Sequence, residues 1–373
     1  MMISIKSLIK NTITKLYKYL IFPYYYLFFF FKKKFKSVVL ISDSANWVLD
    51  QNMRTFSKFL KNILNLSIVK SLYIPNFQYI YLLDQYQILK INFFDNIKKV
   101  IALDYLHGLH FHSPYNKRLL KFITLNQNKI KIIRVTNSYF KKYLVKQGID
   151  KKKIFTIPLS ISNSFKYCDK NDVKKFKEKY NIPSNFFIIG SFQKDGNGWM
   201  KGGSPKLIKG PDIFVKTVKI LNKKIKNLLI LLTGPARGYI KNELKKNNIA
   251  YLHLKELSND QMKFAYSCLD LYLITSRDEG GPMSIFESMT MGVPVVSTRV
   301  GHAHDHIKNF YNGFKTNINN YKQLSYYGYL IYSDNKLRKK IIQNGKLTAK
   351  KNSFAAQTTR WKNFFRIFIN KSS

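Results

Sequence analysis

The chain has 373 residues, and its 45% hydrophobic and 15% aromatic content excludes a disordered protein, because such a chain can bury enough apolar surface to offset the entropy lost on folding. Lys and Arg number 64 against 20 Asp and Glu, so the formal charge of +44 indicates an anionic partner or a bias in residue usage. The two cysteines, Cys168 and Cys268, lie far apart, which excludes a disulfide framework or zinc ribbon and fits a reducing compartment.

Residues 1–36 form a basic and aromatic segment. Its uncharged run, YLIFPYYYLFFFF over Tyr19–Phe31, has lysines on both sides. The run is shorter than the roughly 20 residues needed to span a bilayer, and Pro23 interrupts it. Its composition predicts an element at the interface of an anionic membrane, with a buried first helix or strand, or an uncleaved anchor or signal, as alternatives.

Beyond residue 36, short apolar runs alternate with amphipathic stretches, which predicts a doubly wound parallel sheet. Helices are predicted at Met53–Leu64 and Ser138–Gln147. The predicted strands are Ser37–Ile41, Leu66–Ile74, Lys98–Leu103, Ile130–Val135 and Ile154–Ile157.

A charged stretch and Pro183 then predict a linker over residues 166–185, followed by a second alternating set. Its predicted strands are Phe186–Gly190, Leu228–Thr233, Tyr251–Leu254, Leu269–Thr275 and Val293–Ser297. The chain therefore has two Rossmann-like halves in tandem. The last stretch, Ser353–Ile369, predicts a helix whose apolar stripe must pack on another element; the stripe consists of Trp361, Phe364, Phe365 and Phe368.

The segment Ile274–Asp305 carries the most chemical information. After a strand, a loop holds Glu279 and two glycines, and Pro282 stands where a helix would place its first residue. The glycines allow close approach of a ligand, and a helix start offers free N–H groups to a diphosphate. Glu287 would lie about one and a half turns inside this helix, so the two carboxylates can address different parts of one extended ligand. The alternative is a Rossmann crossover with incidental carboxylates.

These residues resemble the signature of the retaining GT-B glycosyltransferases, glycosyl transferases group 1 of the family 4 type, in which two glutamates are separated by seven residues; here they are Glu279 and Glu287 within SRDEGGPMSIFESMTMGVPVVST. The resemblance implies an α/β fold of two Rossmann-like domains facing a central cleft: an acceptor domain over 37–165 and a nucleotide-sugar domain over 186–350. Residues 351–373 would form a helix that packs back on the first domain.

The resemblance also implies roles for individual residues. Glu279 would contact the transferred sugar beside its anomeric centre, and Glu287 would hold the ribose hydroxyls. The donor diphosphate would meet the helix start that begins at Gly280, with N–H groups from Gly281, Met283 and Ser284. The donor is a nucleoside diphosphate sugar, and no cofactor or metal is expected, since the chain has no D-x-D motif.

A second match lies at the start of the C-terminal half. The strand ending at Gly190 and the pair Lys209-Gly210 correspond to the family's donor-binding positions, and Lys209 would neutralise the departing diphosphate; the alternative is a solvated lysine. The family's Arg after this glycine is missing, and a long loop, Lys194–Lys209, follows. Lys194 or Lys201 is expected to supply the missing charge.

The N-terminal half matches the family less specifically. Residues 136–165 are similar to the segment that leads into the interdomain linker, and Tyr105-Leu106-His107-Gly108 resembles a family motif whose histidine faces the acceptor. His107 is therefore a candidate active-site residue, with a capping or packed histidine as the alternative. His302, His304 and His306 are expected in an extended segment beside Asp305, but no cysteine or carboxylate cluster completes a set of ligands, so a metal site is not expected.

The whole pattern predicts transfer of a sugar, with retention of configuration, to a glycan or lipid-linked hydroxyl acceptor in cell-envelope polysaccharide, lipopolysaccharide or glycolipid synthesis. Charge and the N-terminal segment predict peripheral docking at the inner face of the cytoplasmic membrane. The alternatives are a non-catalytic GT-B scaffold and a nucleic-acid-binding protein. Dispersed lysines without an RNP motif or recognition helix argue against nucleic acid as a partner.

Overall fold

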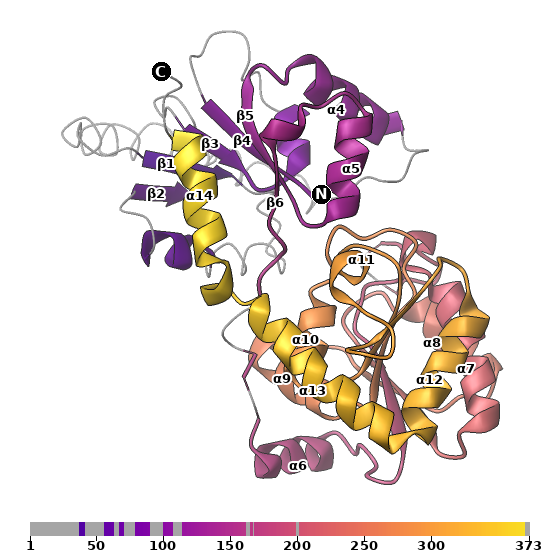
Figure 1. Cartoon of the computed structure of the whole chain (residues 1–373). Coiled ribbons are helices and arrows are strands. Elements are labelled where there is room, and N and C mark those ends of the chain that lie inside the picture. The colour runs from indigo at the N-terminus through magenta and orange to yellow at the C-terminus, as the bar shows by residue number, and fades with distance from the viewer. Residues whose placement is uncertain are drawn as a thin grey trace, which may run out of the picture.

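The computed structural model describes residues 37–41, 56–62, 67–70, 79–89, 100–106, 114–161, 165–166, 168–198 and 201–369, which form two α/β domains (Figure 1). The segment 1–36 lies outside these residues, so its interfacial role stays a prediction. None of the described helices combines the length and the hydropathy that crossing a bilayer requires.

The first domain contains six parallel strands in the order β2-β1-β3-β4-β5-β6. Between them lie a helix over residues 56–62, η2 (Gln85–Leu89), α4 (Pro114–Leu125), α5 (Ser138–Lys146) and η3 (Lys151–Lys153). The strands are β1 (Ser37–Ile41), β2 (Ser67–Lys70), β3 (Tyr79–Leu82), β4 (Val100–Tyr105), β5 (Ile130–Val135) and β6 (Ile154–Thr156). Five of them were predicted. β3, whose four residues YIYL are all buried, was not predicted.

Both faces of this sheet are buried, and successive residues of β1 divide between them. Val39 packs with α4 and α5 on one face, whereas Val38 and Leu40 pack with the 56–62 helix and the last helix, α14 (Thr358–Ile369), on the other. This division explains why the strands read as continuous apolar runs instead of alternating ones.

The second domain repeats the architecture, with strand order β12-β11-β10-β7-β8-β9, all parallel. Its strands are β7 (Phe187–Ser191), β8 (Leu228–Thr233), β9 (Tyr251–Leu254), β10 (Leu271–Ile274), β11 (Val295–Thr298) and β12 (Phe314–Thr316). Its helices are η4 (Leu207–Lys209), α7 (Pro211–Lys224), α8 (Gly238–Lys246), α9 (Asn259–Ser267), α10 (Ser284–Thr290), α11 (His302–His306), α12 (Tyr321–Ser333) and α13 (Asn335–Lys351). The short edge strand β12 was not predicted.

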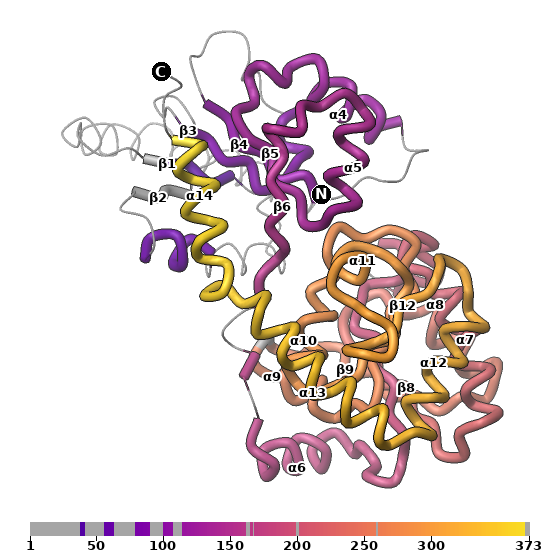
Figure 2. Tube along the Cα trace, in the orientation of Figure 1, coloured from indigo at the N-terminus to yellow at the C-terminus, as the bar shows by residue number. Residues whose placement is uncertain are grey.

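Two segments connect the domains, and they run side by side (Figure 2). In the first, Ile161 donates its N–H to the Asn352 carbonyl of the second at 3.4 Å, and Ser160 Oγ donates to Gln357 Oε1 at 2.8 Å. The first segment continues into α6 (Lys170–Lys179), so the predicted linker over 166–185 contains a helix. The second passes through η5 (Ala355–Gln357) into α14, which returns the chain to the first domain.

The stripe on α14 is fully buried against the first sheet. Trp361 lies 4.5 Å from Phe56, ring centroid to centroid, and Phe364 lies 5.4 Å from Tyr81. The Arg134 guanidinium of β5 stacks over Trp361 and forms a buried ion pair with Asp104 of β4 at 2.7 Å. The last helix of the described chain is therefore part of the core of the first domain.

Candidate active site

The strand order of the second domain indicates where a ligand binds. β7 pairs with β8 on one side and with β10 on the other, so the order of the chain reverses between β7 and β10. In open parallel sheets, ligands bind beyond the carboxyl ends of the strands at such a reversal, because the two loops there diverge. The loops at this point are residues 192–209 after β7 and 275–283 after β10.

Lys209 and Glu279 come from these two loops and meet at the reversal. The Lys209 Nζ lies 2.5 Å from Glu279 Oε1, and the two side chains are 25% and 12% exposed. Ser276 Oγ donates to the same carboxylate oxygen at 2.9 Å. The two residues that the sequence predicted to act on opposite charges of one donor are thus adjacent, although 70 positions separate them.

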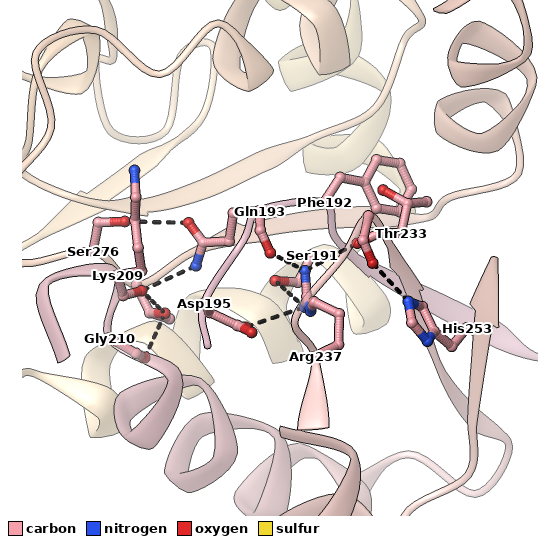
Figure 3. A network of polar contacts seen from close by, with 12 residues as sticks. Ser191, Phe192, Gln193, Asp195, Lys209, Gly210, Thr233, Arg237, His253 and Ser276 are labelled. Atoms are coloured by element: carbon pink, nitrogen blue, oxygen red, sulfur yellow. Dashed lines mark hydrogen bonds and ion pairs between the residues drawn. The ribbon is translucent and has the colours of Figure 1, made fainter. Parts of the chain in front are cut away.

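Gly210 and Gln193 fix the position of Lys209. Gly210 has φ +62°, and a Cβ there would come 2.0 Å from the Thr275 carbonyl oxygen, so only glycine allows this close approach to the end of β10. Gln193 Nε2 donates to the Lys209 carbonyl at 3.0 Å, and Ser276 Oγ donates to Gln193 Oε1 at 3.3 Å (Figure 3). Gln193 therefore ties the two loops together.

Glu287 lies on α10, the helix that follows the Glu279 loop. The helix begins at Ser284, two residues later than predicted, so Glu287 lies in its first turn and not one and a half turns inside. Tyr266 OH donates to Glu287 Oε2 at 2.8 Å. Burial raises the pKa of the Glu287 carboxyl to about 7, and the Tyr266 hydrogen bond opposes this shift.

The backbone before α10 was predicted to offer N–H groups to the diphosphate. In the part of the chain that the structure describes, no protein acceptor takes the N–H groups of Gly281, Met283 and Ser284. Gly280 differs, because it faces the first domain: its carbonyl accepts from Asn137 Nδ2 at 2.9 Å and from Thr136 Oγ1.

Gly190, predicted at the donor, is buried within β7. A Cβ there would come 2.3 Å from Leu269 Cδ1, so the leucine side chain packs directly against the glycine backbone. Tyr272 pairs with Gly190 in the neighbouring strand, and its hydroxyl accepts from the Phe192 N–H at 3.0 Å.

Arg237, which the sequence did not single out, lies beside the end of β7 and the start of the long loop. Its guanidinium reaches the Gln193 carbonyl and lies 3.3 Å from Ser191 Oγ, and it pairs with Asp195 at 3.2 Å (Figure 3). Both side chains of the ion pair are at most 1% exposed, and burial raises the pKa of Asp195 to about 6. Arg237 therefore holds the start of the long loop in place.

The lysines of the long loop divide into two groups. Lys201 is exposed, and its carbonyl accepts from the Gly238 N–H at the start of α8. Lys194 interacts with Lys206, whose pKa is lowered first by burial and then by the charges of Lys209 and Lys194. Lys206 is thus a cation near both Lys194 and Lys209 that the sequence did not indicate.

The predicted histidines lie in different environments. His107 is outside the described residues. The segment of His302, His304 and His306 is the helix α11, not the extended segment expected, because Gly301, at φ +46°, starts a helical turn. His302 is buried, which lowers its pKa well below the usual value, and its Nε2 accepts from the Leu159 N–H at 3.2 Å. Asp305 contacts the first domain at Ser138.

Sequence comparison connects the chain to known proteins. A sequence profile of the family described as glycosyl transferases group 1 matches residues 203–348, which include Lys209, Glu279 and Glu287. An uncharacterized glycosyltransferase of Methanocaldococcus jannaschii is 27% identical over 289 residues, covering 74% of this chain and 77% of that protein.

Solved structures share the two-domain fold. Anabaena HepE, crystallised with UDP and glucose, superposes with a TM-score of 0.71 at 13% identity, covering 89% of this chain and 99% of that chain. WaaG, described as a glycosyltransferase involved in lipopolysaccharide biosynthesis, superposes with a TM-score of 0.65 at 15% identity, covering 89% and 100%. At these identities the likeness concerns the fold.

Proposed function

We propose that the chain, which belongs to the glycosyl transferases group 1 family and has the GT-B fold, is a retaining enzyme. Its reaction transfers a sugar from a nucleoside diphosphate sugar to a hydroxyl acceptor. The acceptor belongs to envelope polysaccharide, lipopolysaccharide or glycolipid synthesis. The family and the fold confirm the prediction from the motif of Glu279 and Glu287. Retention, the acceptor and the pathway are the proposed part.

The pairing of Lys209 with Glu279 at the strand reversal carries the proposal. When the bond between sugar and diphosphate breaks, negative charge grows on the leaving oxygen and positive charge on the anomeric carbon. A lysine ammonium can stabilise the negative charge on the leaving oxygen, and a neighbouring carboxylate can stabilise the positive charge on the anomeric carbon of the same ligand. Both side chains are largely shielded from solvent, which strengthens their effect on a developing charge.

Glu287 and its neighbours fit the nucleoside end of the donor. Its carboxylate can accept hydrogen bonds from two vicinal ribose hydroxyls, and the Tyr266 hydroxyl holds one of its oxygens in place. Gly281, Met283 and Ser284 lie between Glu279 and Glu287 in the chain, where free N–H groups would meet the diphosphate. Lys194 and Lys206 would add charge to the same part of the ligand.

A donor screen tests this function. Uridine, guanosine and adenosine diphosphate sugars are added to the full chain and its thermal unfolding is followed, starting with UDP-glucose, since HepE was solved with that donor. We expect one nucleotide class to raise the melting temperature of the wild type and not of Glu287→Ala. With that donor and a simple acceptor, NMR of the product should show the anomeric configuration of the donor. An inverted product would refute retention, and no stabilisation by any donor would refute the donor site.

We also propose that the first domain docks on an anionic membrane, where a lipid-linked acceptor would lie. Residues 114–149 contain no Asp or Glu. Within this stretch, α4 and α5 pack on the same face of the sheet and expose five basic side chains; these are Lys117, Arg118, Lys121, Lys142 and Lys146. Leu125 is 70% exposed and Tyr115 is 44% exposed on α4, so apolar side chains accompany the charge.

Cosedimentation with vesicles tests this docking. The wild type should bind vesicles that contain phosphatidylglycerol and not vesicles of phosphatidylcholine alone. The double variant Lys117→Glu/Lys121→Glu should lose most of the binding, whereas Lys216→Glu/Lys219→Glu, with the same charge change on α7, should keep it. Equal losses in both variants would show that net charge, and not this face, causes binding. Deletion of residues 1–36 measures the part that the N-terminal segment contributes.

A further inference from the structure

The first domain contacts the loop that carries Glu279. Thr136 Oγ1 and Asn137 Nδ2, from the turn between β5 and α5, both donate to the Gly280 carbonyl, with the Asn137 bond at 2.9 Å. Both donors are buried, at 0% and 1% exposure. The acceptor belongs to the peptide group between Gly280 and Gly281, which follows Glu279 by one residue, so these two bonds constrain the loop backbone from which the Glu279 side chain projects.

The contact is as close as backbones permit. A Cβ on Gly280 would come 1.5 Å from the Leu106 carbonyl oxygen at the end of β4. On the other side, a Cβ on Gly281 would come 2.6 Å from the His302 imidazole. The Glu279–Gly281 backbone is therefore held between the first domain and α11, while the Glu279 carboxylate turns to Lys209 and Ser276 of its own domain.

A second pair of hydrogen bonds joins the same turn to the second domain. Asp305 of α11 accepts from the Ser138 N–H at 2.6 Å and from Ser138 Oγ at 2.5 Å. Ser138 is the first residue of α5, so a carboxylate from one domain meets the positive end of a helix in the other. The turn 136–138 is thus hydrogen-bonded to the Glu279 loop and to α11 of the second domain.

We propose that Thr136 and Asn137 are positioning residues for Glu279, so that the first domain completes the donor site as well as offering the acceptor. The inference rests on the proposed role of Glu279 in transfer. Neither side chain touches the Glu279 carboxylate. Their effect passes through the Gly280–Gly281 peptide group, and a displacement of that group moves the Glu279 carboxylate away from the anomeric centre. It also shifts the Gly281 N–H, while the Lys209 and Glu287 contacts of the donor stay in place.

The variants are chosen to remove only the cross-domain donors. Thr136→Val is nearly isosteric and lacks the hydroxyl, and Thr136→Ser restores it. Asn137 also caps α5, since its Oδ1 accepts from the Phe140 N–H at 3.0 Å. Asn137→Asp keeps this acceptor and loses the Nδ2 donor. The matched control is Thr124→Val, because the Thr124 hydroxyl donates at 2.9 Å to the Leu120 carbonyl within the same helix, α4 of the first domain.

Two readouts are measured on the full chain. The first is steady-state transfer: we expect Thr136→Val and Asn137→Asp to lower kcat about 10-fold to 100-fold with the donor KM within about 3-fold of wild type, because misplacement by about 1 Å can cost this much. The second is amide hydrogen exchange of a peptide covering 276–284, which should become faster in both variants. Thr136→Ser and Thr124→Val should behave as wild type in both.

The outcomes separate this inference from the proposed function. Unchanged kcat in Thr136→Val and Asn137→Asp overturns the positioning role, even if exchange becomes faster. Unchanged exchange overturns the constraint on the loop, whatever the kinetics show. If the wild type transfers no sugar, the proposed function fails, and faster exchange confined to the two variants still supports the constraint on the Glu279 loop.

Discussion

At the scale of single residues, Lys209 is the side chain whose removal should affect the chemistry most directly. Lys209→Ala leaves the Glu279 carboxylate with Ser276 as its remaining hydrogen-bond donor and leaves the diphosphate without its nearest cation. We expect transfer to fall at least about 100-fold, the loss typical of one group that stabilises a developing charge. The measurement is kcat/KM with the donor found in the screen. Lys219→Ala, an exposed lysine on α7, is the control, and equal activity of both variants would contradict the role of Lys209.

Glu287 should make stability depend on pH. Its pKa is raised from 4.5 to about 7, so the folded chain holds this proton more tightly than the unfolded chain. The resulting stabilisation is complete below pH 4.5 and is lost as the pH rises through about 7. Glu287→Gln has no carboxyl to ionise, so its stability does not fall in this pH range. Between pH 5 and pH 8 its free energy of unfolding, relative to that of the wild type, should rise by about 1 to 2 kcal/mol. This value is smaller than the whole pKa shift would give, because the Glu287 carboxyl is partly exposed.

Chemical denaturation at a series of pH values measures this difference. Tyr266→Phe is an informative companion, because the Tyr266 hydrogen bond lowers the pKa of Glu287. Its loss should move the transition to higher pH. Parallel curves for wild type and Glu287→Gln would show that the carboxyl ionises in the folded chain as easily as in the unfolded one.

At the scale of elements, α14 should contribute to the stability of a domain far from it in sequence. Phe364→Ala removes a buried ring that lies against Tyr81 and 6.1 Å from Phe155, and such truncations cost about 3 to 5 kcal/mol. We expect denaturant unfolding of the first domain to shift by this amount while the second domain keeps its midpoint. Lys362→Ala, on the exposed face of the same helix, should leave both midpoints unchanged. A shift confined to the second domain would contradict the packing of α14 described above.

The helices and strands also differ in how well they could be predicted from the sequence. Long apolar runs such as β8 and β5 were predicted because burial on both faces leaves them continuous. The strands β3 and β12 were missed, although other strands of three or four residues were predicted. α11 was expected to be extended, since a helix of five residues leaves no periodic signal.

The residues of the candidate site could be predicted only where they share one local motif. Residues within one motif, Glu279 and Glu287, could be found from their spacing. Tyr266, Gln193 and Arg237 could not, because they reach the site from other strands and helices, and their contacts depend on how the sheet is assembled. Thr136 and Asn137 belong to a different domain, so no local pattern in the sequence connects them with Gly280.

At the scale of the whole molecule, Gly280 should control the approach of the two domains. Gly280→Ala places a methyl group where the Leu106 carbonyl lies, and backbone atoms cannot yield by that much. We expect the domains to separate, with a larger radius of gyration in small-angle X-ray scattering and a large loss of transfer, while the pairing of Lys209 with Glu279 within one domain preserves donor binding. Gly203→Ala is the matched control, because a Cβ there meets no atom within 4 Å. An unchanged radius together with full activity would contradict the contact.

The return of α14 to the first domain has a consequence for synthesis on the ribosome. Domains usually fold in the order in which they emerge, the N-terminal one first. Here the second domain, from α6 to α13, can assemble as soon as residue 351 has left the exit tunnel, whereas the first must wait with one face of its sheet uncovered until Trp361, Phe364 and Phe368 appear. The domain that begins the chain is therefore the one that matures last, and throughout translation its exposed strands are the part that a chaperone would recognise.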